Sequence, residues 1–445
     1  MLKSCLTATL LIFLCFSHFS GTAPESLRRA APQNDHVETS DILRFWRAYE
    51  LIRETDSRKK QLAILKKEFF QTATAGQKAM FKARRYTPEE YLQTINDYPT
   101  FWETVRQQTL QADHYGKQIE KGIVKLKGIY PDLRPANIYF TIGALRSNGT
   151  TLGNKVLIGS ELALGDSLTE LGELPEKFDY LKDYFKNNPV QGIVFLNLHE
   201  YVHTQQKTTV GESLLAKTLI EGVAEWTAEM AMERPSPNPQ IAFGKSNDLE
   251  LKAAFAKEMF SPDFSNWLWN SSDNPYGMRD LAYYLGYAIC ESYYQKANDK
   301  ALAIKTMIEL DYNNAETLAN FVDASGYFDS PIDVYQTAFE LQRPRVVKVE
   351  QLPTPNTLVD PTTTQIRVVF SEPMDRDRIA TEVGTLGAKH VPKIEKTEFL
   401  EDGKILIYTV TLQPKTDYEM VLHWTMRSLQ GYPLVPYTLK FSTGK

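Results

Sequence analysis

The sequence predicts an α+β protein in which a mostly helical domain with a small sheet is followed by an all-β sandwich. Helical periodicity dominates residues 40–342 and is interrupted by short apolar runs only between residues 136 and 164. From Arg343 onward, a proline-rich stretch leads into alternating apolar and polar residues that continue almost to the C-terminus. A chain of 445 residues is also too long for one ordinary core. We therefore place a domain boundary near residue 343, between a domain at 40–342 and one at 343–445.

The composition is that of a globular protein, with 42% hydrophobic and 24% charged residues. These values exclude a disordered, collagenous or multi-span membrane chain. The net charge is -5, and like charges do not form long runs. Nucleic acid is therefore not an expected partner.

The N-terminus has the pattern of an export signal over residues 1–23. Lys3 is followed by an apolar stretch at residues 6–19 that is too short to span a bilayer, and small residues follow it. Removal of this segment leaves a mature chain without a transmembrane span, which is exported to the periplasm, the cell surface or the medium. A lipid anchor on Cys15 is the alternative, although Leu14 is not the small residue that such a site requires. Cys290 then remains as the single cysteine, so no intrachain disulfide is expected.

The first part of the chain is predicted to be helical over residues 40–130. Ser40 can cap the first helix, and Thr87 with Pro88 can cap a later one. The apolar runs at 138–142 and 156–158 predict two strands separated by a turn-rich segment. Asn188 and Pro189 predict the start of a helix that runs to about Lys207. Further helices are expected at about 212–233, 248–260, 278–297, 299–310 and 315–323.

The last domain contains several runs in which apolar residues alternate with polar ones, and Asp402-Gly403 is a hairpin turn signal. About seven short strands in about 100 residues are typical of an immunoglobulin-like sandwich. The clearest strand runs lie at residues 366–370, 405–412, 418–424 and 437–442.

The helix after Pro189 contains a motif that predicts a metal site. His199, Glu200 and His203 form H-E-x-x-H. Histidines at positions i and i+4 lie on one face of a helix, where both can bind the same Zn²⁺ ion. Glu200 would face the open coordination position and could accept a proton from a water molecule that the ion activates.

The next helix offers the third ligand, because Glu221 and Glu225 lie one turn apart in the segment EGVAEW. Small residues at 222 and 224 would let this helix approach the H-E-x-x-H helix, which favours Glu221 as the ligand. Glu225 could then hold the second nitrogen of a ligating histidine. If the second helix were shifted by one turn, Glu225 would be the ligand and Glu221 would support the histidine. In a further alternative, Glu221, Glu225 and Glu229 form a solvent-exposed helix face.

HEYVH followed by EGVAEW resembles the gluzincin class of zinc metallopeptidases, and most closely the predicted zinc-dependent proteases of bacterial envelopes that are related to gliding-motility lipoproteins. The resemblance extends over residues 136–340 and includes IYFTIG, VLIGSE and LAYYLGY. It implies a zincin-like fold. It also implies roles for individual residues, with Glu200 as general base, Glu225 as support for a histidine, and zinc ligands at His199, His203 and Glu221.

Many gluzincins stabilise the oxyanion with a tyrosine or histidine, and YYLGY offers Tyr283, Tyr284 and Tyr287. We expect Tyr283 to take this role, with simple packing as the alternative. The C-terminal domain resembles bacterial Ig-like modules through FSEPMD, TDYEMVL and LKFSTG. Such modules are spacers or binding appendages, which implies a cell-surface or envelope partner.

The sequence thus predicts an exported zinc metallopeptidase that hydrolyses peptide or protein substrates. The alternative is an envelope binding or assembly protein that has a peptidase-like scaffold and a vestigial or structural zinc site. The presence of Glu200 favours the enzyme, because a purely structural site has no use for a general base.

Overall fold

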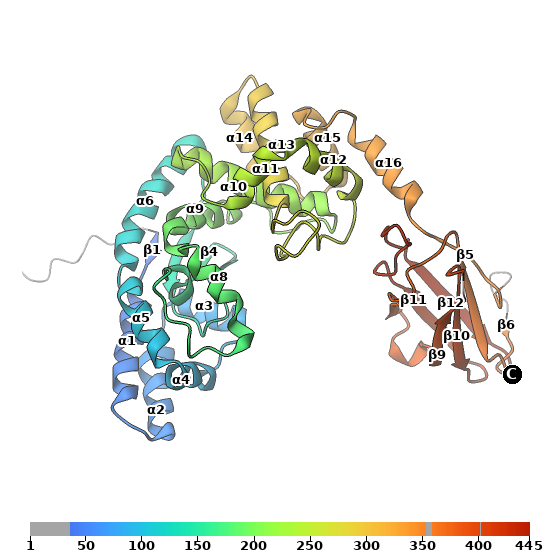
Figure 1. Cartoon of the computed structure of the whole chain (residues 1–445), viewed down its shortest axis with the longest axis horizontal. Helices are drawn as coiled ribbons and strands as arrows, with labels where there is room; N and C mark the ends of the chain where they lie inside the picture. The colour runs from blue at the N-terminus through green and yellow to red at the C-terminus, as the bar shows by residue number, and fades with distance from the viewer. Residues whose placement is uncertain (1–35, 353–357, 401) are drawn as a thin grey trace, which may run out of the picture.

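The computed structural model describes residues 36–352, 358–400 and 402–445, with a helical region followed by two β sheets (Figure 1). This arrangement confirms the predicted α+β class. The predicted signal segment, including Lys3 and Cys15, lies outside the described residues. Among the helices that are described, none combines the length and apolar character needed to cross a membrane.

The first part of the described chain is helical, as predicted. Thr87 caps α4 by accepting a hydrogen bond from the Glu90 amide, and Pro88 is the first helical residue. Ser40 is not a cap, because α1 begins at Ser40 and Thr39 takes the cap position. The helices are α1 (Ser40–Arg53), α2 (Arg58–Leu65), the π-helical turn η2 (Lys66–Phe70), α3 (Ala75–Arg84), α4 (Pro88–Asp97), α5 (Pro99–Thr109) and α6 (Ala112–Ile129).

A four-stranded sheet with the order β1-β2-β4-β3 combines a strand before α1 with three strands after α6. Its strands are β1 (Val37–Glu38), β2 (Asn137–Thr141), β3 (Gly149–Leu152) and β4 (Lys155–Gly159). The two predicted apolar runs form β2 and β4, which pair in parallel. The sequence did not predict β1 or β3, because β1 is only two residues long and β3 lies in the turn-rich segment. β3 pairs antiparallel with β4 and lies at the end of the sheet.

Two long helices form the centre of the helical region. α9 (Ile193–His203) follows the 3₁₀ turn η4 (Pro189–Gly192), and α10 (Leu214–Met232) follows α9. The predicted start is confirmed in position, because Asn188 takes the cap position and Pro189 is the first residue of η4. The Asn188 side chain makes no cap hydrogen bond, and the residue has a left-handed φ of 50°. The predicted end is wrong, because α9 ends at His203 rather than at Lys207. The shorter elements before it are α7 (Ser160–Ala163), η3 (Glu176–Phe178) and α8 (Tyr180–Lys186).

Six helices complete the helical region: α11 (Pro239–Ser246), α12 (Asp248–Glu258), α13 (Ala282–Lys296), α14 (Lys300–Ile308), α15 (Ala315–Ser325) and α16 (Ile332–Gln342). The sequence analysis missed α11 and α16. α11 begins inside the proline-rich segment, where Pro239 occupies the first helical turn, a position that tolerates proline.

The C-terminal region contains two four-stranded sheets with the orders β5-β7-β10-β9 and β6-β12-β11-β8. The eight strands are β5 (Val346–Val349), β6 (Leu358–Val359), β7 (Gln365–Phe370), β8 (Thr381–Val383), β9 (Lys393–Phe399), β10 (Ile405–Thr411), β11 (Asp417–Leu422) and β12 (Tyr437–Thr443). Their apolar side chains form a hydrophobic core that is separate from the core of the helical region.

The junction between these regions is short and is held by polar contacts. The Arg343 guanidinium, just after α16, donates hydrogen bonds to the carbonyl oxygens of Pro433 and Leu434. Arg427 forms an ion pair with Asp263 of the helical region.

Candidate metal centre

α9 is deeply buried, and its packing restricts the positions of its polar side chains. Leu198 is fully buried and packs against Gly122 of α6, where a Cβ atom would come within 2.6 Å of the leucine side chain. This contact fixes one face of α9 against α6. The adjacent His199 is only 4% exposed. The helix therefore presents its histidines in a site with little access to water.

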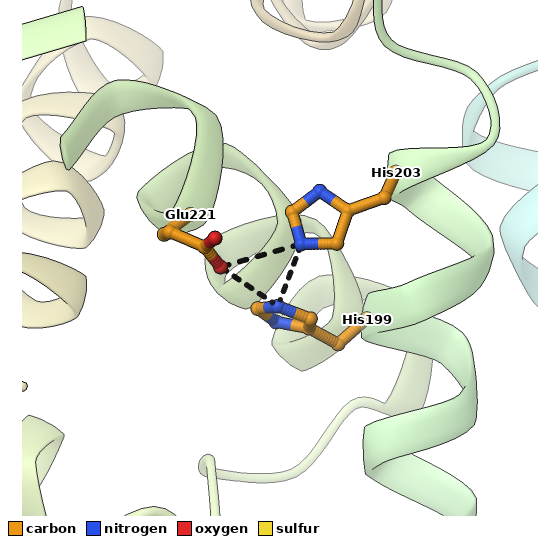
Figure 2. A group of neighbouring side chains, drawn as sticks. All are labelled: His199, His203 and Glu221. Carbon is orange, nitrogen blue, oxygen red and sulfur yellow. Dashed lines mark hydrogen bonds and ion pairs between the residues drawn. The ribbon is translucent and has the colours of Figure 1, made fainter. Parts of the chain in front are cut away.

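The structure brings His199, His203 and Glu221 together (Figure 2). The Nε2 atoms of the two histidines are 3.0 Å apart. Each of these nitrogens lies 3.3 Å from Oε2 of Glu221. Three donor atoms at the corners of so small a triangle can bind one ion.

The donor set and its dimensions fit Zn²⁺. Two imidazole nitrogens and one carboxylate oxygen form a His₂Glu set, which is a known ligand set of catalytic zinc. Ligand atoms that surround a tetrahedral ion at about 2.0–2.1 Å are roughly 3.3 Å from one another. The separations of 3.0–3.3 Å in this site match that value. Three protein ligands would leave one coordination position open.

The charges in the site also favour a cation. Burial alone would lower the pKa of His199, but the carboxylates of Glu221 and Glu225 outweigh it and raise the pKa to about 10. Burial alone would raise the pKa of Glu221, whereas the neighbouring His203 and His199 hold it well below its usual range. The carboxylates thus create a negative potential at the histidines, which stabilises positive charge there.

Glu225 lies behind His199 and does not take part in the triangle. Its side chain has no exposed surface, and its Oε2 atom lies 3.0 Å from Nδ1 of His199. Ser236 and Asn238, in the loop before α11, donate hydrogen bonds to the same carboxylate. Because an ionised carboxylate only accepts hydrogen bonds, Nδ1 of His199 keeps a proton, and Nε2 is the nitrogen that can bind a metal once its own proton is displaced.

The three glutamates of α10 do not form a solvent-exposed face. The side chains of Glu221 and Glu229 are 14% and 17% exposed, and that of Glu225 is fully buried. Glu229 accepts hydrogen bonds from the Tyr287 hydroxyl and from the Ser236 amide. Each of the three glutamates therefore has polar partners inside the protein.

Gly222 plays a different part from the one that the sequence suggested. It contacts Gly286 of α13, where a Cβ atom on Gly222 would lie 2.2 Å from the backbone of Gly286. The glycine therefore allows close packing of α10 on α13, and it does not bring α10 onto α9. The expectation was wrong because the sequence does not show which neighbouring helix a small residue faces.

The contact between α10 and α13 places Tyr283 at the site. The Tyr283 ring stacks on His199, with ring centroids 5.8 Å apart and an angle of 18° between the planes. Burial and the neighbouring Glu221 carboxylate raise the pKa of its hydroxyl, so that this group remains a hydrogen-bond donor at neutral pH. Tyr284 and Tyr287 instead donate hydrogen bonds to Asp248 and Glu229. Of the three candidate tyrosines, Tyr283 is the one that stacks on a candidate ligand.

Glu200 is connected to the sheet. The hydroxyl of Thr151 in β3 donates a 2.5 Å hydrogen bond to Oε2 of Glu200. β3 has a free edge in the described part of the chain, whereas β4 is paired on both sides. The apolar run at residues 156–158 forms the interior strand β4, so the free edge near Glu200 belongs to β3.

Sequence reasoning missed the polar residues that contact the candidate ligands and base. Gln206 has its Oε1 atom 2.6 Å from Nδ1 of His203, Thr151 binds Glu200, and Ser236 and Asn238 bind Glu225. Gln206 lies three residues after His203 but beyond the end of α9, so helical spacing did not reveal this contact.

Comparison with known proteins identifies the class of the C-terminal region. A family model for the bacterial Ig-like domain matches residues 342–443. This match confirms the predicted resemblance of the last domain. No curated protein sequence matches the chain.

Solved structures with some similarity include those of the surface layer protein SbsC. A structure of its domains 1–6 has 14% sequence identity and a TM-score of 0.18, and the match covers 60% of this chain and 37% of that one. A crystal structure of a longer S-layer chain has 13% identity and a TM-score of 0.18, with 92% and 45% covered. This chain thus spans less than half the length of either protein, and TM-scores this low do not establish a shared fold.

Proposed function

We propose that the protein is a zinc-dependent peptidase of the zincin type, with His199, His203 and Glu221 as the zinc ligands. The observation that carries the proposal is the triangle of donor atoms in Figure 2. Glu200 directly follows the ligand His199 in α9 and is the candidate base. A purely structural zinc site is usually closed by four protein ligands. A site with three protein ligands and an unused carboxylate fits catalysis better.

A zinc ion held by His199, His203 and Glu221 would supply Lewis acidity toward a scissile carbonyl and a water molecule. Glu200 would accept a proton from the attacking water molecule and donate it to the leaving amine. The Tyr283 hydroxyl donates a hydrogen bond to the oxygen on which negative charge develops. Glu225 keeps Nε2 of His199 free and correctly oriented.

The edge strand β3 suggests how a substrate is held. An extended peptide can add to a free strand edge through main-chain hydrogen bonds. Thr151 lies in β3 and binds Glu200, so a peptide on this edge would run beside the base. This arrangement favours a peptide or protein as the substrate class.

The bacterial Ig-like domain supports an exported location, either on the cell surface or in the envelope. Its core is separate from that of the helical region, as expected for a spacer or a binding appendage. We assign the chemistry to the helical region and a possible partner surface to the Ig-like domain.

Digestion of an unfolded protein such as casein tests the proposal. The zinc-loaded protein should cut casein, a chelator should stop cleavage, and added zinc should restore it. Protein that binds one zinc ion but cleaves neither casein nor a library of short peptides would instead favour the envelope binding or assembly role.

A further inference from the structure

His203 has a partner of its own on the side away from the ligand triangle. Its Nδ1 atom lies 2.6 Å from Oε1 of Gln206, a side chain that is only 3% exposed. The amide nitrogen of Gln206 donates to the carbonyl oxygen of Ile220 at 2.9 Å and to the hydroxyl of Tyr312 at 3.0 Å. A single buried amide thus connects α9, α10 and the segment after α14.

These contacts fix the orientation of the amide. The Ile220 carbonyl can only accept a hydrogen bond, so the amide nitrogen of Gln206 must face it. The Tyr312 hydroxyl donates its own proton to the carbonyl oxygen of Met307 and therefore accepts from Gln206. The reversed amide would place two carbonyl oxygens 2.9 Å apart, which is repulsive. Oε1 of Gln206 must therefore face His203.

The orientation of Gln206 in turn fixes the tautomer of His203. Because an amide oxygen only accepts hydrogen bonds, Nδ1 of His203 carries a proton and donates it to Gln206. The lone pair then lies on Nε2, the nitrogen that faces Glu221 at 3.3 Å. Ile220 directly precedes Glu221 in the chain, so the same amide also ties the histidine to the backbone beside the third donor.

We propose that Gln206 is a positioning residue that holds His203 as its Nε2-binding tautomer and sets its distance from Glu221. The inference rests on the proposed zinc site. Gln206 acts on His203 as Glu225 acts on His199, but it is neutral and therefore adds no further negative charge to the carboxylates of Glu221 and Glu225.

Replacement of Gln206 by methionine tests this role, with Gln205→Met as a matched control. Gln205 is an equally buried amide, 4% exposed, but it bonds the backbone of Arg134 and contacts neither histidine. Competitive titration of the full-length protein with zinc and a fluorescent chelator should show a loss of about ten to a hundredfold in affinity for Gln206→Met. Gln205→Met should remain within about threefold of the parent protein, since the ligands keep their partners.

A spectroscopic measurement separates positioning from packing. In the zinc-saturated parent protein, nuclear magnetic resonance of labelled histidine should show Nδ1 protons on both His199 and His203 that exchange slowly with water. Gln206→Met should lose this protection at His203 alone. If Gln206→Met does not fold, Tyr312→Phe removes one anchor of the amide and should give a smaller loss of affinity and faster exchange at His203.

The inference would be overturned if the parent protein and the folded Gln206→Met variant had equal zinc affinity and equal exchange of the His203 Nδ1 proton. Equal losses of zinc affinity in Gln206→Met and Gln205→Met would also overturn it. Tyr312→Phe with unchanged affinity and exchange would count against it in the same way. A parent protein that binds no zinc would instead refute the proposed metal site itself, so the two failures can be told apart.

Discussion

Alanine at Glu221 should weaken zinc binding more than alanine at Glu225, whereas alanine at Glu225 should lower the stability more. Glu221 supplies a donor atom 3.3 Å from each of the two histidine nitrogens. Its loss leaves two protein ligands, so Glu221→Ala should weaken zinc binding by more than about a hundredfold, beyond the range expected for an outer partner. Glu225 contacts only the far side of His199, so Glu225→Ala should cost about ten to a hundredfold.

The stability of the metal-free protein should follow the reverse order. Glu225 is fully buried and accepts hydrogen bonds from Ser236, Asn238 and His199, so alanine leaves three polar groups without their partner. Each buried polar group that loses its hydrogen-bond partner lowers the free energy of unfolding by about 1–3 kcal/mol. The loss is smaller for Ser236 and Asn238, because these two loop residues can turn toward water. We expect Glu225→Ala to lower the free energy of unfolding by about 2–4 kcal/mol and Glu221→Ala by about 1 kcal/mol.

Zinc titration against a chelator ranks the zinc affinities of the two variants. Urea unfolding of the chelator-treated proteins ranks their stabilities. A larger loss of zinc affinity in Glu225→Ala than in Glu221→Ala would refute the assignment of ligand and support. The roles of the two carboxylates would then be exchanged.

Three further outcomes follow from the structure. A fragment that ends at residue 343 retains the entire helical core and should fold and cleave short peptides, whereas its aggregation would show that the two regions depend on each other. Zinc must displace the proton that His199 holds below its pKa of about 10, so zinc affinity should rise with pH between about pH 6 and 9. Calorimetry in buffers of different protonation enthalpy should detect the released proton, and its absence would contradict the charge state of the metal-free site. Gly222→Ala should destabilise the protein by about 1–3 kcal/mol through its clash with Gly286, while Gly128→Ala, where a Cβ atom meets nothing within 4 Å, should be neutral or slightly stabilising in urea unfolding. Equal effects at the two glycines would argue against the close helix contact.

The elements with strong local signals could be predicted from the sequence. Thr87 and Pro88 mark the start of α4, and the apolar runs of β2 and β4 stand out because these strands are buried. β3 could not be recognised, because its residues are polar and partly exposed and it becomes a strand only through pairing with β4.

In the candidate site, too, some residues could be predicted from the sequence and others could not. The spacing of His199 and His203 is a helical property, so the sequence alone could suggest their convergence. Tyr283 could be named only through a resemblance, and its place depends on the contact between Gly222 and Gly286, two residues far apart in the chain. The partners Gln206 and Thr151 depend on packing between elements and on a loop conformation, which no spacing rule describes.

The central claim is that Glu200 acts as a base and does not bind the metal. The most direct test compares peptide hydrolysis by the parent protein and by Glu200→Gln at equal zinc occupancy, with metal content measured on the same samples. We expect both proteins to hold one zinc ion, and the variant to be at least about a hundredfold slower. Equal rates in the two proteins, or loss of zinc from the variant, would contradict the account.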